Sequence, residues 1–233
     1  MPLLRGAVPS PRHRLAAATP HKSVGVTPPQ FIVIPKKLSM WGNDRFGDCV
    51  SAEEAFAKAC HNPEIFISEQ EVIQWARQRG FLNGSDLTSV LDDMEKDGFV
   101  QDKSIYDDGG VTSVDWTNRA VLHSAIAHGP VKIGVAASQL EAVCNATPQF
   151  PVNGWVATGF SKDKAEDHCV SLCGFGTIAW LASQLNTPIP SHVDASEGAY
   201  AMFTWSSIGI IDVPSMLAIT HEAWLRNPTT LIK

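Results

Sequence analysis

The sequence predicts an α+β domain in which a helical half is followed by a strand-rich half. Segments with the apolar spacing of helices dominate the chain up to about residue 127, and apolar β-favouring runs follow. The two kinds of segment do not alternate regularly, as they do in parallel α/β folds. With 233 residues, 44% of them hydrophobic and 18% charged, the chain is long and apolar enough for one domain with a sizeable core.

The first predicted helix begins near Cys49. Small and apolar residues recur there at a spacing that places them on one helical face, which predicts a buried, Ala-rich helix: Ala52, Ala55, Phe56 and Ala59. A second helix is indicated by Ser68 and Glu71, a capping-box pattern, and ends at Gly80.

Two further helices and several strands complete the prediction. Helical spacing predicts helices over residues 89–96 and 116–127, and Gly129-Pro130 is a stop signal for the second of these. Apolar, β-favouring runs flanked by turn residues predict strands at residues 131–136, 168–175 and 199–205. A short apolar run at residues 31–34 is suited to pairing as an edge strand before Pro35.

The chain divides into two unequal parts. Residues 1–30 are rich in Pro, Ala, Ser, Thr and basic residues, and they contain no periodic stretch long enough to fold alone. We expect residues 1–30 to form an extended N-terminal arm, either disordered or lying along the body of the protein. We expect residues 31–233 to form a single domain.

Charge and cysteine content exclude several classes of function. The formal charge of −6 comes from 18 basic and 24 acidic side chains, which disfavours nucleic acid and anionic membranes as partners. No apolar run approaches the length needed to cross a bilayer, and the first residues lack the apolar core of a secretory signal. Five cysteines, an odd number without a CxxC pair, indicate a reducing, cytoplasmic location, and we expect no disulfide scaffold, no metal and no cofactor.

Cys49 is the first candidate catalytic residue. A polar, glycine-containing loop, residues 41–48, delivers it directly to the N-terminus of the predicted buried helix. Unpaired N–H groups and the positive end of the helix dipole stabilise a thiolate at such a position. The alternative interpretation of Cys49 is a small buried apolar residue, which most free cysteines are.

His168 is the second candidate. It opens an apolar strand, where its ring can face a cleft while Val170 and Leu172 pack inward and Cys169 and Cys173 face the other way. The alternative is a core or surface histidine with a satisfied hydrogen bond.

Four segments, in order, resemble the papain family of cysteine peptidases. Asn43 stands six residues before Cys49, where the family has Gln. The other three matches are Ala-Ile-Ala-His-Gly-Pro-Val at residues 125–131, Asp-His-Cys-Val at 167–170 leading to Gly-Phe-Gly at 174–176, and Tyr200 to Gly209 with its Trp-Ser-Ser. The resemblance implies a papain-like fold in which the cysteine helix faces the histidine strand. It also implies Cys49 as nucleophile, His168 as general base and acid, and Asn43 as an oxyanion donor.

The chain departs from the family pattern at the site itself. Alignment from Tyr200 puts Trp205 where the family has the Asn that orients its histidine, and an indole cannot accept the imidazole proton. Other Asn and Gln residues, or Asp212, are candidate substitutes. Asn43 is one methylene shorter than Gln, and Asp48 adds a carboxyl group beside the nucleophile. The family's helical pro-segment and disulfides have no counterparts.

Two functional hypotheses of different class follow. The first is a cysteine-dependent acyl-transfer enzyme acting on a peptide or small amide through a Cys49 thioester: a peptidase or amidase with water as acceptor, or an amide-forming transferase with an amine. The second is a catalytically impaired papain-like protein whose cleft binds a peptide or partner. An unrelated fold, in which the alignment is coincidental, is the remaining alternative.

Overall fold

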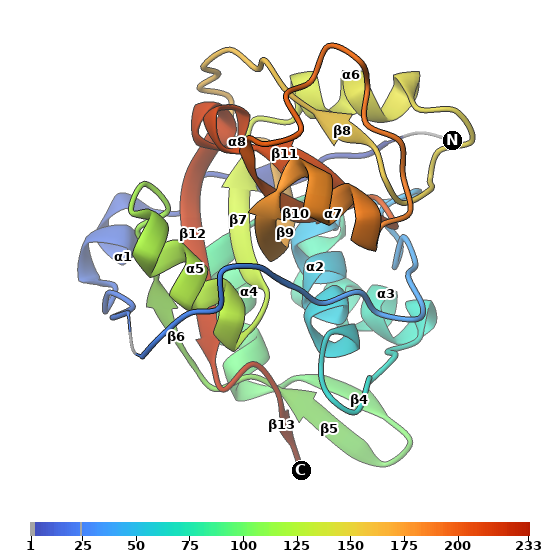
Figure 1. The fold of residues 1–233 in the computed structure, drawn as a ribbon. Coiled ribbons are helices and arrows are strands. Elements are labelled where there is room, and N and C mark those ends of the chain that lie inside the picture. Colours follow the sequence, from blue (N-terminus) through green and yellow to red (C-terminus); the bar gives the residue numbers. More distant parts are fainter. Residues whose placement is uncertain (1–2, 24) are drawn as a thin grey trace.

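A curved, mainly antiparallel sheet forms the centre of the molecule (Figure 1). The computed structural model describes residues 3–23 and 25–233. The strands follow one another across the sheet in the order β6 (Gly110–Ser113), β12 (Thr220–Asn227), β7 (Val131–Val135), β9 (His168–Thr177), β10 (Gly198–Thr204), β11 (Ser207–Asp212) and β8 (Val156–Ala157). β2 (Phe31–Ile32) pairs with β9 at Phe175 and Gly174.

Strand β9 carries the candidate histidine and is buried on both faces. His168 opposes Val135 at the end of the β7–β9 ladder. Val170 and Leu172 contribute to one hydrophobic cluster, whereas Cys169 and Cys173 contribute to a second. The predicted alternation along this strand is therefore confirmed. Both sets of side chains lie in cores because helices cover the sheet on each side.

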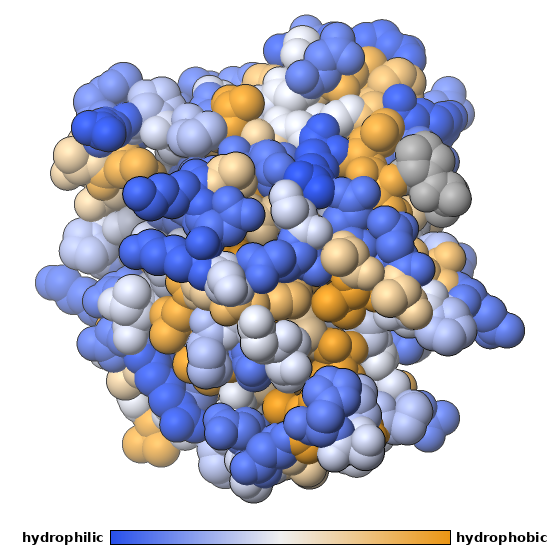
Figure 2. All heavy atoms as spheres, turned by 90° about the horizontal axis from the view of Figure 1, so that it is seen from above, coloured by the Kyte–Doolittle hydropathy of each residue, from blue (hydrophilic) through white to orange (hydrophobic). Residues whose placement is uncertain are grey.

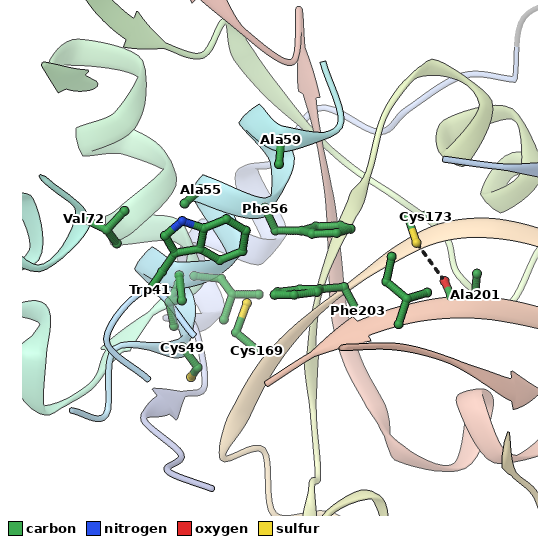
Figure 3. Packing of buried hydrophobic residues seen from close by; sticks show 14 of the residues in the cluster. Trp41, Cys49, Ala55, Phe56, Ala59, Val72, Cys169, Cys173, Ala201 and Phe203 are labelled. Atoms are coloured by element: carbon green, nitrogen blue, oxygen red, sulfur yellow. Dashed lines mark hydrogen bonds between the residues drawn. The ribbon is translucent and has the colours of Figure 1, made fainter. Parts of the chain in front are cut away.

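One core lies between the sheet and the helical half of the chain. α2 (Cys49–Ala59), α3 (Glu69–Arg79), α4 (Leu87–Lys96) and α7 (Ile178–Gln184) contribute buried residues to it. At its centre the rings of Phe56 and Phe203 stack 4.0 Å apart, as Figure 3 shows. The second core packs α5 (Arg119–His128), α6 (Ser138–Ala146) and α8 (Val213–Ile219) on the sheet. The predicted α+β class is confirmed.

Capping residues explain where the helices begin. The Ser68 hydroxyl accepts the Glu71 N–H, and Gly80 ends α3 in the left-handed conformation, as predicted. α4 begins two residues before the predicted Ser89 because the Asp86 carboxylate caps it. α5 begins at Arg119, three residues later than predicted, because Asn118 accepts the N–H groups of Ala120 and Val121.

The N-terminal arm lies along the body of the protein and has short elements of its own. β1 (Ala7–Val8) pairs in parallel with β3 (Ser85–Asp86), and α1 (Arg12–Ala17) follows. In Figure 1 the blue ribbon passes from the side of α6 to α1 on the opposite side. No residue of α1 is buried, which explains why the sequence lacks an amphipathic signal there.

The remaining elements lie at the periphery. β4 (Phe99–Gln101), β5 (Ser104–Asp107) and β13 (Leu231–Ile232) form a small separate sheet, and the 3₁₀ turn η1 (Phe81–Asn83) follows α3. On the face shown in Figure 2, apolar residues form separate patches between hydrophilic ones. Within residues 3–23 and 25–233, no helix is long and apolar enough to cross a membrane.

Candidate active site

Cys49 is the first residue of α2, where the sequence places it, and its side chain is buried. Burial raises the pKa of the thiol to about 12, although the backbone amides of Cys169, Gly6 and Ala7 act in the opposite direction. The amide of Cys169 follows His168 directly, so the thiol lies against the start of β9. Figure 3 shows Cys49 and Cys169 in the packed region below the Trp41 indole. Cys49 and His168, 119 residues apart in the chain, thus lie at the starts of two neighbouring elements, α2 and β9.

Thr204 and Trp205 hold the imidazole of His168. The Thr204 hydroxyl lies 2.8 Å from Nε2 of His168. The Trp205 indole stacks on the same ring at 4.2 Å, with 14° between the planes. Burial, together with the nearby charge of Arg5, lowers the pKa of His168 to about 3. Its Nδ1 is buried and has no hydrogen-bond partner among the described residues.

The residue that orients the histidine is therefore one position earlier than the alignment indicates. Thr204 occupies that place, and Trp205 covers the ring instead of replacing the missing Asn. Asp212, a candidate substitute from the sequence, caps α8 by accepting the Ser215 N–H at 2.8 Å. A one-residue shift at the end of β10 is invisible in the sequence, because the tight turn that follows, with Trp205 and Ser206 both at positive φ, sets the register.

Asn43 and Asp48 lie in the loop that precedes Cys49 and α2. Asn43 is buried, and its side-chain amide donates to the Phe46 carbonyl at 3.1 Å, which engages one of its two N–H bonds within the loop. Asp48 is fully buried, and burial raises its pKa to about 8. Its carboxyl group is therefore largely neutral at pH 7, which weakens the expected repulsion of a thiolate.

Gly42 allows this loop to approach α2 closely. It has φ of +100°, a conformation that glycine adopts without strain. A Cβ atom at this position would lie 2.6 Å from Oδ2 of Asp48 and 2.7 Å from Cγ1 of Ile73. Gly42 thus allows the chain to pass close to Asp48 and α3 before it enters α2.

Residues 4–8 of the arm, here called the cover segment, lie directly over the thiol. The N–H groups of Gly6 and Ala7 donate to the Asp167 carbonyl at 3.1 and 3.2 Å. The Trp205 indole donates to the Leu4 carbonyl at 2.9 Å, and the Ser85 N–H donates to the Gly6 carbonyl at 2.9 Å. The cover segment therefore bridges the histidine side and the helical side of the site, and it contributes to the burial of Cys49, which is only 2% exposed.

Gly6 is the closest contact between the cover segment and the site. A Cβ atom on Gly6 would lie 1.7 Å from the carbonyl oxygen of Gly47, and one on Gly84 would lie 2.8 Å from the Gly6 carbonyl oxygen. Only a residue without a side chain fits between these two backbone segments. No local sequence pattern indicates this contact, because it depends on how the arm folds back over the domain.

Solved structures of cysteine proteases resemble the fold of this chain. One is Amb a 11, a ragweed pollen allergen in its proform, with a TM-score of 0.61 and 13% identity, over 92% of this chain and 72% of that chain. Another, from work on the mite allergens Blo t 1 and Der p 1, has a TM-score of 0.60 and 16% identity, over 90% and 74%. Procathepsin L 3 of Tenebrio molitor larval midgut has a TM-score of 0.61 and 13% identity, over 90% and 73%.

The chain has a papain-like fold. No family model and no curated protein matches the sequence. At these identities the likeness concerns the fold, and the chemistry of this papain-like chain must be argued from its own side chains. Among the described residues, no cluster of three or more His, Cys, Asp and Glu side chains is arranged to hold a metal ion.

Proposed function

We propose that this protein is a cysteine-dependent acyl-transfer enzyme, a peptidase or amidase in the simplest case, with Cys49 as nucleophile and His168 as general base. The observation that carries the proposal is the state of His168. Thr204 engages Nε2 and Trp205 covers the ring, while Nδ1 has no hydrogen-bond partner among the described residues. A buried, oriented imidazole with one free nitrogen is suited to accept the thiol proton.

The reaction uses these groups in two stages. His168 takes the proton from Cys49, and the thiolate attacks the carbonyl carbon of an amide. The N-terminal amides of α2 and the side chain of Asn43 stabilise the oxyanion. The C–N bond then breaks, and the imidazolium gives its proton to the leaving amine. Water, activated by His168, hydrolyses the thioester. An amine in place of water would give a new amide.

Substrate can reach the thiol only after the cover segment moves. With the segment in place Cys49 is buried, and the pKa values of thiol and imidazole lie at about 12 and about 3, so both are neutral at pH 7. Displacement of the segment would return water to the site and reduce the desolvation that causes both shifts. We therefore propose that the closed form is inactive and that the open form carries the activity.

A reducing, cytoplasmic setting suits this chemistry. All five cysteines are free, and four of them are buried. A nucleophilic thiol of this kind must stay reduced to react. The proposed substrate is a peptide or a small amide.

The Gly6→Val variant tests the proposal, because a valine side chain does not fit against Gly47 and should displace the cover segment. We expect iodoacetamide at pH 7 to label Cys49 roughly tenfold or more faster in Gly6→Val than in the wild type, since the thiol becomes hydrated. Adding His168→Ala should slow the labelling again. Peptide mapping by mass spectrometry identifies which cysteine reacts.

Thr19→Val is the matched control, because Thr19 lies in the same arm, is exposed and has no positive φ. It should label at the wild-type rate. If Cys49 in Gly6→Val reacts no faster than the other cysteines while urea unfolding shows an intact fold, the enzyme proposal fails.

The second candidate function is a papain-like binding protein without catalysis. The burial of Cys49 beneath the cover segment favours it, because a thiol in this state is unreactive. Under this hypothesis a Cys49→Ser variant keeps the protein's native role. Under the enzyme hypothesis that variant loses its role with the fold intact.

A further inference from the structure

The side chain of Arg5, in the cover segment, lies between two carboxylates beside the candidate histidine. Its guanidinium group forms ion pairs with Asp167, at 2.5 Å, and with Glu141. It also donates to the Ser138 hydroxyl at 3.2 Å. All three partners belong to the body of the domain rather than to the arm, so they remain when the cover segment leaves.

The backbone of the domain positions both carboxylates, and a hydrogen bond also anchors that of Asp167. Asp167 directly precedes His168, and its Oδ1 accepts the Ala137 N–H at 2.9 Å, at the start of α6. Glu141 lies in the first turn of the same helix. Each carboxylate side chain is about 30% exposed while Arg5 is bound, at 31% and 29%. Without a cation between them, the carboxylates of Asp167 and Glu141 would repel each other.

The main chain beside Arg5 passes over the nucleophile. Gly6, its neighbour, and Ala7 donate their N–H groups to the Asp167 carbonyl, and the same amides favour a lower pKa of the Cys49 thiol. A peptide that replaces the cover segment across Cys49 must pass the same two carboxylates. A side chain within one or two residues of the reacting carbonyl would then lie where the guanidinium group of Arg5 lies now.

We propose that Glu141 and Asp167 form an acidic subsite that selects peptides with a basic side chain, arginine above all, next to the reacting bond. A planar guanidinium group reaches both carboxylates at once, whereas a lysine ammonium group is a point charge. This assignment rests on the proposed function for the identity of the reacting bond. The recognition of the basic side chain can be measured without turnover.

The test uses the full-length Arg5→Gln/Gly6→Val protein, in which the resident arginine is absent and the cover segment is displaced. Two peptides with the sequence of residues 3–8, the cover segment and the residue before it, are compared as ligands: Leu-Leu-Arg-Gly-Ala-Val, and the same peptide with norleucine in place of arginine. Calorimetry gives their affinities, and protection of Cys49 from iodoacetamide shows that they bind over the thiol. We expect the arginine peptide to bind roughly tenfold more tightly.

Glu141→Gln in the same background keeps the shape of the side chain and removes one charge. It should reduce the preference for arginine to about twofold or less. Glu197→Gln, which removes the same charge at an exposed site, should leave the preference unchanged. Equal binding of the two peptides, no binding of either, or a preference that survives Glu141→Gln would overturn the subsite.

The outcomes separate this inference from the proposed function. A reactive Cys49 combined with equal peptide affinities removes the acidic subsite and leaves the enzyme proposal standing. An arginine preference combined with an unreactive Cys49 supports the subsite in a binding protein and removes the enzyme.

Discussion

At the scale of single residues, the proposed function of His168 depends on its contact with Thr204. Its hydroxyl is the polar group that faces Nε2, and it is itself buried, so the contact is shielded from water. Threonine is shorter than the Asn expected from the resemblance. Because β10 ends at Thr204, its hydroxyl still lies 2.8 Å from Nε2 of His168 and makes the contact expected of the Asn side chain.

We expect Thr204→Val to slow the labelling of Cys49 roughly tenfold in the Gly6→Val background, because valine keeps the volume and loses the hydrogen bond that orients the ring. Thr204→Ser keeps a hydroxyl and should retain most of the rate. The pH dependence of labelling distinguishes orientation from packing, because a purely structural role would leave its midpoint unchanged. Equal rates in the valine and serine variants would contradict the orienting role.

Residue types and order were predictable at this site, whereas contacts across the fold were not. Cys49 at a helix start and His168 at a strand start follow from local pattern. Thr204 depends on the exact end of β10, and Gly6 depends on the path of an arm that has no periodicity of its own. Local sequence carries little information on either.

At the scale of elements, α2 combines the nucleophile with a buried cluster of charges. Glu53, Glu54 and Lys58 on this helix are all completely buried, with partners far away in the chain. The Arg226 guanidinium binds both glutamates, and its Nε lies 2.9 Å from Glu54 Oε2. Lys132 pairs with the same glutamates and also donates to the Val50 carbonyl at 2.9 Å, which ties the first turn of α2 to β7.

The sequence predicted an Ala-rich buried face on α2, which is correct, but not the burial of its charged face. The partners of Glu54 lie 78 and 172 residues away, so no spacing within the helix reveals them. Two adjacent acidic residues, Asp107 and Asp108, predict a solvated turn from the sequence alone. Asp108 is buried instead and forms a 2.5 Å ion pair with Lys58.

We expect Glu54→Gln to lower the free energy of unfolding by about 3–5 kcal/mol, because Arg226 and Lys132 would then lack one of their buried counter-charges. Urea unfolding at pH 7 measures this loss. Glu95→Gln, on the exposed face of α4, should change stability by about 0.5 kcal/mol or less. A similar small effect of both substitutions would show that the buried cluster adjusts to the loss.

At the scale of the whole molecule, buried carboxyl groups make stability depend on pH. Burial raises the pKa of Asp48 to about 8 and that of Glu166 to about 9. Because each folded pKa lies above its unfolded value, the stabilisation is complete below about pH 4 and is lost as the pH rises towards 8 to 9. The lowered pKa of His168 acts in the opposite sense, since its contribution is lost as the pH falls below about 6.5.

We therefore expect the wild type to unfold at lower urea concentration at pH 8.5 than at pH 5.5. Asp48→Asn, which does not titrate, should remove part of this loss, on the order of a few kcal/mol. Parallel unfolding curves from pH 5 to 9 measure the difference. An Asp48→Asn protein with the same pH slope as the wild type would show that Asp48 is ionised in the folded state.

The α+β class of the molecule could be predicted from the order of its helical and strand segments. The packing of these elements against one another could not. Helices cover β9 on both sides, and two strands that were not predicted, β11 and β12, also contribute residues to both cores. The order of the segments in the sequence does not show which residues belong to which core. The described part of the predicted arm, residues 3–23 and 25–30, packs on the body, where Ser10 donates its backbone N–H to Glu222 at 3.1 Å.

Gly6 and its neighbours are joined by peptide bonds to the domain whose thiol they cover, and this tether has a quantitative consequence. Dilution cannot separate the two, because the local concentration of a short tethered peptide is in the millimolar range whatever the protein concentration. A soluble competitor must therefore reach comparable concentrations or bind much more tightly. Cleavage of the chain between the cover segment and the domain would convert the same contacts into a weak, reversible association.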